Sequence, residues 1–316
     1  MPVRANPPVM RLLITLAALL LLPACITVDE SRVFRAERVT ADRPELSIRM
    51  GDGWLKNGPT FTHAMTTLDG RTIATTVADG DAVTLNMTVN DKQIEKWDLA
   101  PDRRPVILYC GGAQWDRVNH GFAQLMFLTV MGDPVLWDYP GYGDSPGTPS
   151  IEGLRDLASH IAAWADGLAG ERPLVLWGHS LGGAVCVEVA SHSSAADLLV
   201  LEASFDRGGD AVRGVVKNFI PVPLRVDVDD AVAAIDTGTA AAALDMSMLV
   251  LVAARDEVIP PDQQRALAAK IGAGEREGRT VVEVPTRHDT TMLHPNTLRA
   301  VRAEFERLGW LAVPES

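Results

Sequence analysis

Residues 174–182 read Leu-Val-Leu-Trp-Gly-His-Ser-Leu-Gly, and this stretch decides the fold of the chain. Its first four residues form a short apolar run, which predicts a strand buried on both faces of a sheet. A Gly-x-Ser-x-Gly pentapeptide at 178–182 follows at once, and an apolar helical pattern begins directly after it. A strand, a sharp turn and a helix in this order predict a nucleophile elbow, with Ser180 exposed on the turn.

The two glycines of the pentapeptide have a mechanical reason. An elbow forces Ser180 into a strained backbone conformation, and side chains two residues away on either side would collide. Gly178 and Gly182 remove those side chains. The N-terminus of the next helix then presents free N–H groups where negative charge develops during a reaction. We expect His179, inside the pentapeptide, to pack rather than to act as the base.

Apolar runs of strand length alternate with helical patterns on both sides of the elbow. The predicted strands are 106–110, 134–138, 174–177, 198–201, 248–252 and 281–284, and the predicted helices are 117–131, 150–168, 181–192 and 296–308. Strands separated by helices predict a parallel sheet with right-handed crossovers. Earlier in the chain, Asp69-Gly70 lies between two strand-like runs and predicts a hairpin, followed by a further strand at 82–89.

A nucleophilic serine needs a base, and the base needs an acidic group that orients it. The acid should follow a strand, so that it reaches the same sheet edge as the serine. Asp256 lies four residues past the predicted strand 248–252 and is the predicted acid. Glu257 and Asp206 stay open as alternatives, because each also lies shortly after a predicted strand.

The base should likewise follow a strand, so that it reaches the same sheet edge as Ser180. His288 lies four residues past the predicted strand 281–284, on a loop, and is the predicted base. His294 is the alternative, although it precedes Pro295 and is expected to begin the last helix.

Two backbone N–H groups should point at the oxyanion that forms when the serine attacks. Leu181, immediately after the nucleophile, is expected to supply one of them. The loop after the predicted strand 106–110 reads Gly111-Gly112-Ala113-Gln114 and should supply the other. Gly112 is the predicted donor in this loop and Ala113 is the alternative.

Roughly residues 105–310 resemble the serine α/β-hydrolase superfamily, and within it the esterase-like α/β-hydrolase-domain proteins. Besides the elbow, the resemblance rests on three segments: Asp138-Tyr-Pro-Gly-Tyr-Gly-Asp-Ser145, Asp256-Glu-Val-Ile-Pro260 and Arg287-His-Asp289. It implies an α/β-hydrolase fold, with a mostly parallel sheet, helices on both faces and a small lid insertion at about residues 205–246. The chain departs from the family where Cys110-Gly111 replaces the common His-Gly, and where Arg287 replaces the Gly before the catalytic histidine.

The resemblance also implies a serine hydrolase that cleaves an ester or related acyl bond of a small molecule through an acyl-enzyme intermediate. Ser180 would attack the carbonyl carbon, His288 would move the proton, and Asp256 would orient the imidazole. We expect no metal ion and no organic cofactor. Two alternatives stay open: a serine peptidase of the same fold, and a catalytically idle hydrolase fold that binds a ligand at the cell envelope.

The first 24 residues resemble a bacterial lipoprotein signal. Arg4 and Arg11 precede an uncharged run at 12–22, which is too short to span a bilayer. The run ends in Leu22-Pro-Ala-Cys25, and cleavage before Cys25 would leave a lipid-modified N-terminal cysteine. We therefore expect a lipid-anchored protein outside the cytoplasm. Because Ile26 rather than Asp follows the cysteine, we expect the outer membrane, facing the periplasm, in a Gram-negative cell.

The remaining chain is expected to hold one folded domain. The mixed, polar residues 25–60 predict a tether and an irregular segment, and residues 61–312 predict a single α/β-hydrolase domain. Export would permit a disulfide, yet Cys110 and Cys186 are expected to be small buried apolar residues.

The composition limits the classes of function. The 316 residues are 47% hydrophobic, which is ordinary for a globular protein. With 29 Lys or Arg against 41 Asp or Glu, the net charge is −12 at pH 7. We therefore expect no nucleic-acid partner, since such binding needs a basic surface.

Overall fold

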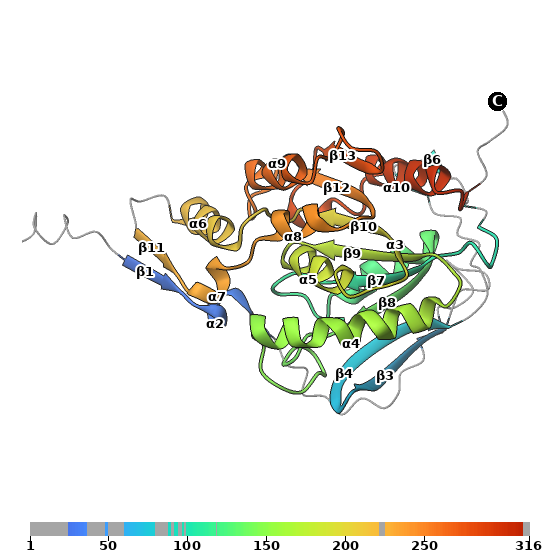
Figure 1. Ribbon diagram of the computed structural model, residues 1–316, viewed down its shortest axis with the longest axis horizontal. Helices are drawn as coiled ribbons and strands as arrows, with labels where there is room; N and C mark the ends of the chain where they lie inside the picture. Colours follow the sequence, from blue (N-terminus) through green and yellow to red (C-terminus); the bar gives the residue numbers. More distant parts are fainter. Residues whose placement is uncertain are drawn as a thin grey trace, which may run out of the picture.

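A nine-stranded sheet runs through the centre of the computed structural model (Figure 1). The structure describes residues 25–36, 48–49, 60–79, 88–89, 92–93, 97, 99–117, 119–220 and 225–311. The strands follow the order β13-β12-β10-β9-β7-β8-β4-β3-β2 across the sheet. Their bounds are β2 Ile48–Arg49, β3 Thr60–Leu68, β4 Arg71–Asp79, β7 Val106–Cys110, β8 Asp133–Trp137, β9 Leu174–His179, β10 Ala196–Glu202, β12 Ser247–Ala253 and β13 Arg279–Val284.

Six neighbouring strands of this sheet are parallel, as the sequence predicts: β8, β7, β9, β10, β12 and β13. Every residue of β7 and β9 is buried, because helices cover both faces of the sheet. The predicted hairpin is confirmed: β3 and β4 pair antiparallel, and Asp69 and Gly70 both have positive φ, 44° and 77°. Most of the predicted strand 82–89 lies outside the described residues; its end, β5 (Thr88–Val89), pairs with β6 (Lys92–Gln93).

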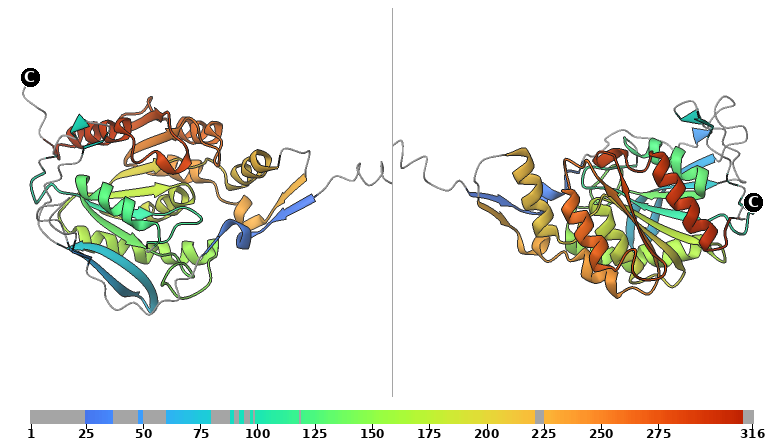
Figure 2. Two further views of the ribbon diagram at one scale, coloured as in Figure 1. Left: turned by 180° about the vertical axis from the view of Figure 1, so that it is seen from behind. Right: turned by 90° about the horizontal axis from the view of Figure 1, so that it is seen from above.

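Helices lie on both faces of the sheet (Figure 2). On one face, α4 (Ile151–Ala169), α5 (Leu181–Ala190), α8 (Thr237–Ala243) and α9 (Pro261–Lys270) bury their apolar sides. On the other face, α3 (Gly121–Met131) and α10 (Pro295–Arg307) do so. The helix predicted from residue 117 begins only at Gly121, whereas α4 begins where predicted, capped by the Ser150 hydroxyl.

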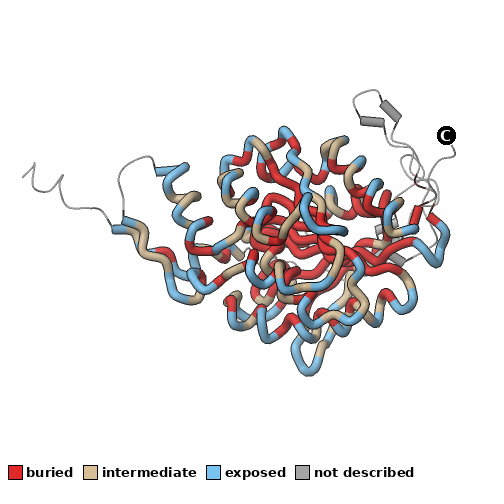
Figure 3. Tube along the Cα trace, turned by 45° about the horizontal axis from the view of Figure 1, so that its top comes forward, coloured by how far each residue is buried: buried red, intermediate tan, exposed pale blue. Residues whose placement is uncertain are grey.

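The lid insertion, about residues 205–246, lies between β10 and β12. It contains α6 (Gly208–Phe219), β11 (Arg225–Val228), α7 (Asp230–Ala233) and α8. Its outer part projects from one end of the molecule and is mostly exposed or half-buried, while the buried residues gather in the sheet (Figure 3). Among the described residues, no helix has the length and apolar character needed to cross a membrane.

The segment expected to begin a tether is instead attached to the lid insertion. Strand β1 (Cys25–Val28) pairs in parallel with β11, and α2 (Glu30–Val33) follows it. Phe34 is buried in the core and packs edge-on against Tyr142, with the two ring centroids 6.4 Å apart. These two anchors hold residues 25–34 against the domain. The predicted signal, residues 1–24, lies outside the described residues.

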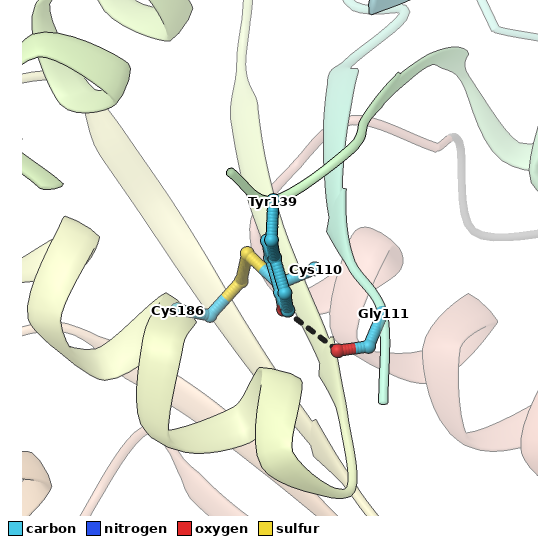
Figure 4. The surroundings of a disulfide bond; sticks show 4 residues. All are labelled: Cys110, Gly111, Tyr139 and Cys186. Carbon is cyan, nitrogen blue, oxygen red and sulfur yellow. Dashed lines mark hydrogen bonds between the residues drawn. A yellow bond between two sulfur atoms is a disulfide. The ribbon is translucent and has the colours of Figure 1, made fainter. Parts of the chain in front are cut away.

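Cys110 and Cys186 form a disulfide, so the expectation of two separate buried cysteines is wrong (Figure 4). Cys110 ends β7, and Cys186 lies on the side of α5 that packs on β7. Their Cα atoms are 6.1 Å apart, within the range that a disulfide spans. Each position was correctly expected to be buried, but the sequence does not reveal that the strand end and the helix face meet.

Candidate active site

Ser180 occupies a strained turn between β9 and α5. Its φ of 55° and ψ of −120° place a non-glycine residue outside the regions that L-residues ordinarily adopt. Two hydrogen bonds hold the turn: the Ser180 N–H donates to the Glu202 carbonyl at 2.9 Å, and the Ser204 hydroxyl donates to the Ser180 carbonyl at 2.9 Å. The surroundings therefore fix a backbone conformation that the chain would not adopt alone.

Close backbone approach explains the glycines around Ser180. A Cβ atom added at Gly178 would lie 2.6 Å from the Cα of Gly183, and one added at Gly182 would overlap the carbonyl of Cys110. The start of α5 consequently lies directly against the end of β7. This contact brings the loop after β7 next to the elbow.

Asp256 and His288 meet in a buried hydrogen bond. The Nδ1 of His288 lies 2.7 Å from Oδ2 of Asp256, and both side chains are almost fully buried. The same carboxylate accepts hydrogen bonds from the backbone N–H groups of Val258 and Ile259, at 2.8 and 2.9 Å, and from Nε2 of Gln264 at 2.7 Å. These contacts fix the carboxylate in position. Burial lowers the pKa of His288, but the hydrogen bond and charge of Asp256 outweigh it, and the net pKa is raised.

The alternative acids and base lie in other environments. Asp206 accepts from Nζ of Lys270 at 3.1 Å, and Glu257 forms an exposed ion pair with Arg287 at 2.8 Å. His294 caps α10, its Nδ1 accepting from the Asn296 N–H at 3.1 Å. The structure therefore joins His288 to Asp256 and gives these three side chains other partners.

The loop after β7 lies beside the elbow. A Cβ atom added at Gly112 would be 3.5 Å from Cβ of Ser180 and 3.3 Å from Nδ1 of His179. Leu181 is the first residue of α5, so its N–H is among those that a helix leaves unpaired at its N-terminus. The two backbone segments predicted to supply oxyanion donors thus both lie next to Ser180. The carbonyl of Ala113, the alternative donor residue, accepts from the Tyr142 hydroxyl at 2.8 Å.

A cavity of about 420 Å³ opens onto Ser180 and His288. Its wall comes from the end of β7 and the loop after it, from α3, from the ends of β9 and β10, from Ser180 at the elbow, and from the loops after β12 and β13. The lining residues are Tyr109, Gly112, Ala113, Gln114, Trp115, His120, Ala123, Gln124, His179, Ser180, Glu202, Val258, His288, Asp289, Met292 and Leu293. None of these lining residues is a Lys or an Arg, so the described wall offers no permanent cation to an anionic ligand.

Glu202 is a buried carboxyl of this cavity that was not among the residues predicted from the sequence. Burial raises its pKa to about 7. It accepts from Nε1 of Trp177 at 2.7 Å and from the Met292 N–H at 2.6 Å. A carboxylate at the end of an otherwise apolar strand was a signal that could have singled it out.

His179 packs against His288, with ring centroids 4.7 Å apart. Burial and the neighbouring charge of His288 lower the pKa of His179 to about 4, so the ring is neutral at pH 7. Its Nε2 can then donate to the carbonyl oxygen of His288, 3.2 Å away. The packing role expected from the sequence therefore extends to a polar contact with the loop that carries His288.

One group of side chains in the described part of the chain could hold a metal ion, namely His179, His288 and Asp289, whose ligand atoms lie within 4.8 Å of one another. Nδ1 of His288 already bonds Asp256, and Nε2 of His179 faces a carbonyl oxygen. This group overlaps the Ser180 cavity and does not form a separate site.

Comparison with known proteins agrees with this architecture. Residues 107–228 match the model of a family described as the alpha/beta hydrolase family. The Pyrococcus furiosus esterase Pf2001 superposes with a TM-score of 0.59, at 13% identity, over 89% of this chain and 99% of that one. The chain has the α/β-hydrolase fold. A cold-adapted esterase from an Arctic intertidal metagenomic library is also similar, with a TM-score of 0.52 and 15% identity over 83% of this chain and 99% of that one.

Sequence relatives match over about a third of the chain. Rat lysophosphatidylserine lipase ABHD12 is 34% identical over 114 residues, which are 34% of this chain and 29% of the relative. Human protein ABHD12B is 37% identical over 110 residues, which are 33% of this chain and 30% of the relative. The match thus spans less than a third of each relative's length. The superfamily expected from the motifs is supported by these similarities.

Proposed function

We propose that this protein is a serine hydrolase that cleaves an ester or related acyl bond through an acyl-enzyme intermediate. Oγ of Ser180 attacks the carbonyl carbon while Nε2 of His288 takes its proton. The N–H groups of Leu181 and Gly112 hold the oxyanion, and the imidazolium returns the proton to the leaving group. Water then attacks the acyl-enzyme by the same route, and Asp256 stabilises the imidazolium throughout.

One observation carries this proposal: a serine on a strained elbow shares a cavity with a histidine whose Nδ1 is bonded to a buried carboxylate. A proton on Nδ1 leaves Nε2 as the acceptor of the neutral ring. The ring is thereby in the tautomer that a general base needs. The strained backbone of Ser180 also favours a functional role, since such conformations concentrate at active sites.

The substrate is proposed to be a small acyl ester. A cavity of about 420 Å³ suits a small molecule. A second, mostly apolar cavity of about 340 Å³ lies beside Leu181, with Leu154, Val185 and Ile235 in its wall, and could receive an acyl chain. The relatives named as lysophosphatidylserine lipases place lysophospholipids among the esters to be tested.

Steady-state hydrolysis of an ester panel tests the proposal. The panel combines short and long acyl chains with neutral alcohols, and adds lysophosphatidylserine. The wild-type protein should hydrolyse at least one neutral ester, and Ser180→Ala should lose roughly 10⁴-fold or more of that kcat. Equal turnover by Ser180→Ala would remove Ser180 from the mechanism.

We further propose that lipid at Cys25 anchors the protein in the cell envelope, outside the cytoplasm. The lipoprotein-like segment that ends at Cys25 motivates this proposal, and Cys25 is exposed on β1 at the lid insertion. In a Gram-negative host, wild-type protein should fractionate with outer membranes and carry a lipid mass on the N-terminal cysteine. Cys25→Ser protein should not be processed there. A Cys25→Ser protein that is still cleaved at the same bond and still membrane-bound would refute the lipid anchor.

A further inference from the structure

The hydroxyl of Tyr139 holds one peptide group of the loop after β7. Tyr139 is 2% exposed, and its hydroxyl donates to the carbonyl oxygen of Gly111 at 2.6 Å (Figure 4). That carbonyl belongs to the peptide bond between Gly111 and Gly112. The described residues contain no cis peptide, and in a planar trans peptide the N–H points opposite to the C=O. Tyr139 therefore sets the direction in which the Gly112 N–H points.

The disulfide joins the two elements that flank the oxyanion position. Cys110 directly precedes Gly111, and Cys186 lies on α5, the helix that begins with Leu181. Both cysteines are completely buried. The cross-link therefore connects the loop that carries Gly112 to the helix that carries the second proposed donor.

We propose that Tyr139 and the Cys110–Cys186 disulfide are positioning groups that preorganise the oxyanion hole. The inference rests on the proposed function, since it requires the N–H groups of Gly112 and Leu181 to hold an oxyanion. Neither positioning group touches the substrate. Each acts through the backbone, by fixing where a donor lies before the oxyanion forms, so its loss should weaken transition-state binding more than substrate binding.

Tyr139→Phe is the first test, because it removes the hydroxyl and keeps the ring and the disulfide. Tyr142→Phe is its matched control. Tyr142 also donates to a carbonyl of this loop, that of Ala113, but this peptide group carries the N–H of Gln114 rather than that of Gly112. We expect kcat of Tyr139→Phe to fall by roughly 10- to 100-fold with KM changed less than about twofold, while Tyr142→Phe loses much less.

The Ki of a trifluoromethyl ketone analogue of the best ester is a second test, because a purely structural role of Tyr139 would leave this Ki unchanged. The ketone forms a tetrahedral oxyanion on the serine, so its Ki should rise in Tyr139→Phe by the factor by which kcat/KM falls. The alcohol product should bind both proteins equally. Equal Ki values for the ketone in wild type and Tyr139→Phe would overturn the role of Tyr139.

The Cys110→Ala/Cys186→Ala double variant tests the disulfide. We expect the same pattern: a lower kcat, a nearly unchanged KM and a higher Ki for the trifluoromethyl ketone. Val301→Ala is the control for lost stability, since Val301 is fully buried on α10, away from the loop. If a double variant that remains folded keeps wild-type kcat and ketone affinity, the disulfide has no positioning role. If Val301→Ala, with the same loss of stability as the double variant, also lost the same factor of kcat, the positioning role of the disulfide would be overturned as well.

The outcomes separate this inference from the proposed function. A wild-type protein that hydrolyses esters through Ser180, together with unaffected Tyr139→Phe and double-cysteine variants, overturns the inference alone. Ester turnover that survives Ser180→Ala overturns both, because no serine-bound oxyanion then forms.

Discussion

Nδ1 of His288 lies 2.7 Å from the carboxylate of Asp256, although 32 positions separate the two residues in the chain. They meet because β12 and β13 are parallel neighbours in the sheet. Loops that leave the carboxyl ends of adjacent parallel strands reach the same edge. The pairing is therefore a consequence of topology, and Gln264 and two backbone N–H groups then fix the carboxylate.

This pairing predicts which histidine is required for turnover. His288→Ala should lower kcat by roughly 10⁴- to 10⁶-fold, because the histidine and the serine of a triad act as a unit. His294→Ala should keep near-normal kcat and lose roughly 1 kcal/mol of stability, since it removes the cap of α10. Steady-state kinetics and thermal unfolding of both variants make the comparison. The reverse order of kcat losses would show that the wrong histidine has been assigned.

The close contact at the elbow predicts opposite effects for two Gly→Ala substitutions. Gly182→Ala should lower the free energy of unfolding by about 2 kcal/mol or more, because the new Cβ overlaps the carbonyl of Cys110. Gly167→Ala is the matched control: it lies in α4, exposed, with no heavy atom within 4 Å of an added Cβ. It should stabilise the protein by about 0.5–1 kcal/mol. Denaturant unfolding measures both, and a Gly182→Ala protein of wild-type stability would contradict the packing described at the elbow.

Glu202 predicts a pH dependence of stability. Its pKa is about 7 in the folded protein against an ordinary value of 4.5, so the folded state binds this proton more tightly than the unfolded state. The resulting stabilisation is complete below pH 4.5 and is lost as pH rises through 7. Glu202→Gln removes it, so the loss of unfolding free energy between pH 5 and pH 8 should shrink by roughly 2.5 kcal/mol.

Glu304→Gln is the control for that measurement, because Glu304 is a buried glutamate on α10, away from the cavity. Urea unfolding at both pH values provides the data. A Glu202→Gln protein with the same pH dependence as wild type would show that Glu202 is ionised at all pH values tested.

The disulfide predicts a stability that depends on oxidation. Its two cysteines are 76 positions apart, and closing a loop of that length is expected to contribute about 2–4 kcal/mol. Cys110→Ala/Cys186→Ala should therefore unfold at lower denaturant concentration than the oxidised wild type. Mass spectrometry of unreduced peptides should find the Cys110–Cys186 pair. Two free thiols in the protein isolated from its native compartment would contradict the pairing.

Much of the fold follows from local patterns in the sequence. The apolar strand before Ser180, the two glycines and the following helix together predict the elbow, since each agrees with the same strand–turn–helix geometry. The positions of Asp256 and His288 were predictable because each follows an apolar strand, and parallel strands end at one edge. The fold and the places of these side chains thus needed only short-range periodicity and one topological rule.

The remaining features depend on contacts that no local pattern encodes. Cys110 and Cys186 pair because a strand end meets one side of a helix, and Tyr139 reaches Gly111 from the neighbouring strand's loop. Strand β1 is only four residues long, and each of its residues pairs with the β11 residue that lies 200 positions later in the chain. Such partners appear only once the elements are packed together, so they had to come from the structure.

Covalent labelling tests the central claim most directly. A fluorophosphonate reacts with an activated serine, and the adduct can be located by peptide mass spectrometry. We predict one adduct per wild-type chain, located on Ser180, and none on Ser180→Ala under the same conditions. An adduct on the Ser180→Ala protein, or a folded wild-type protein that takes up no probe, would contradict the account of Ser180 as an activated nucleophile.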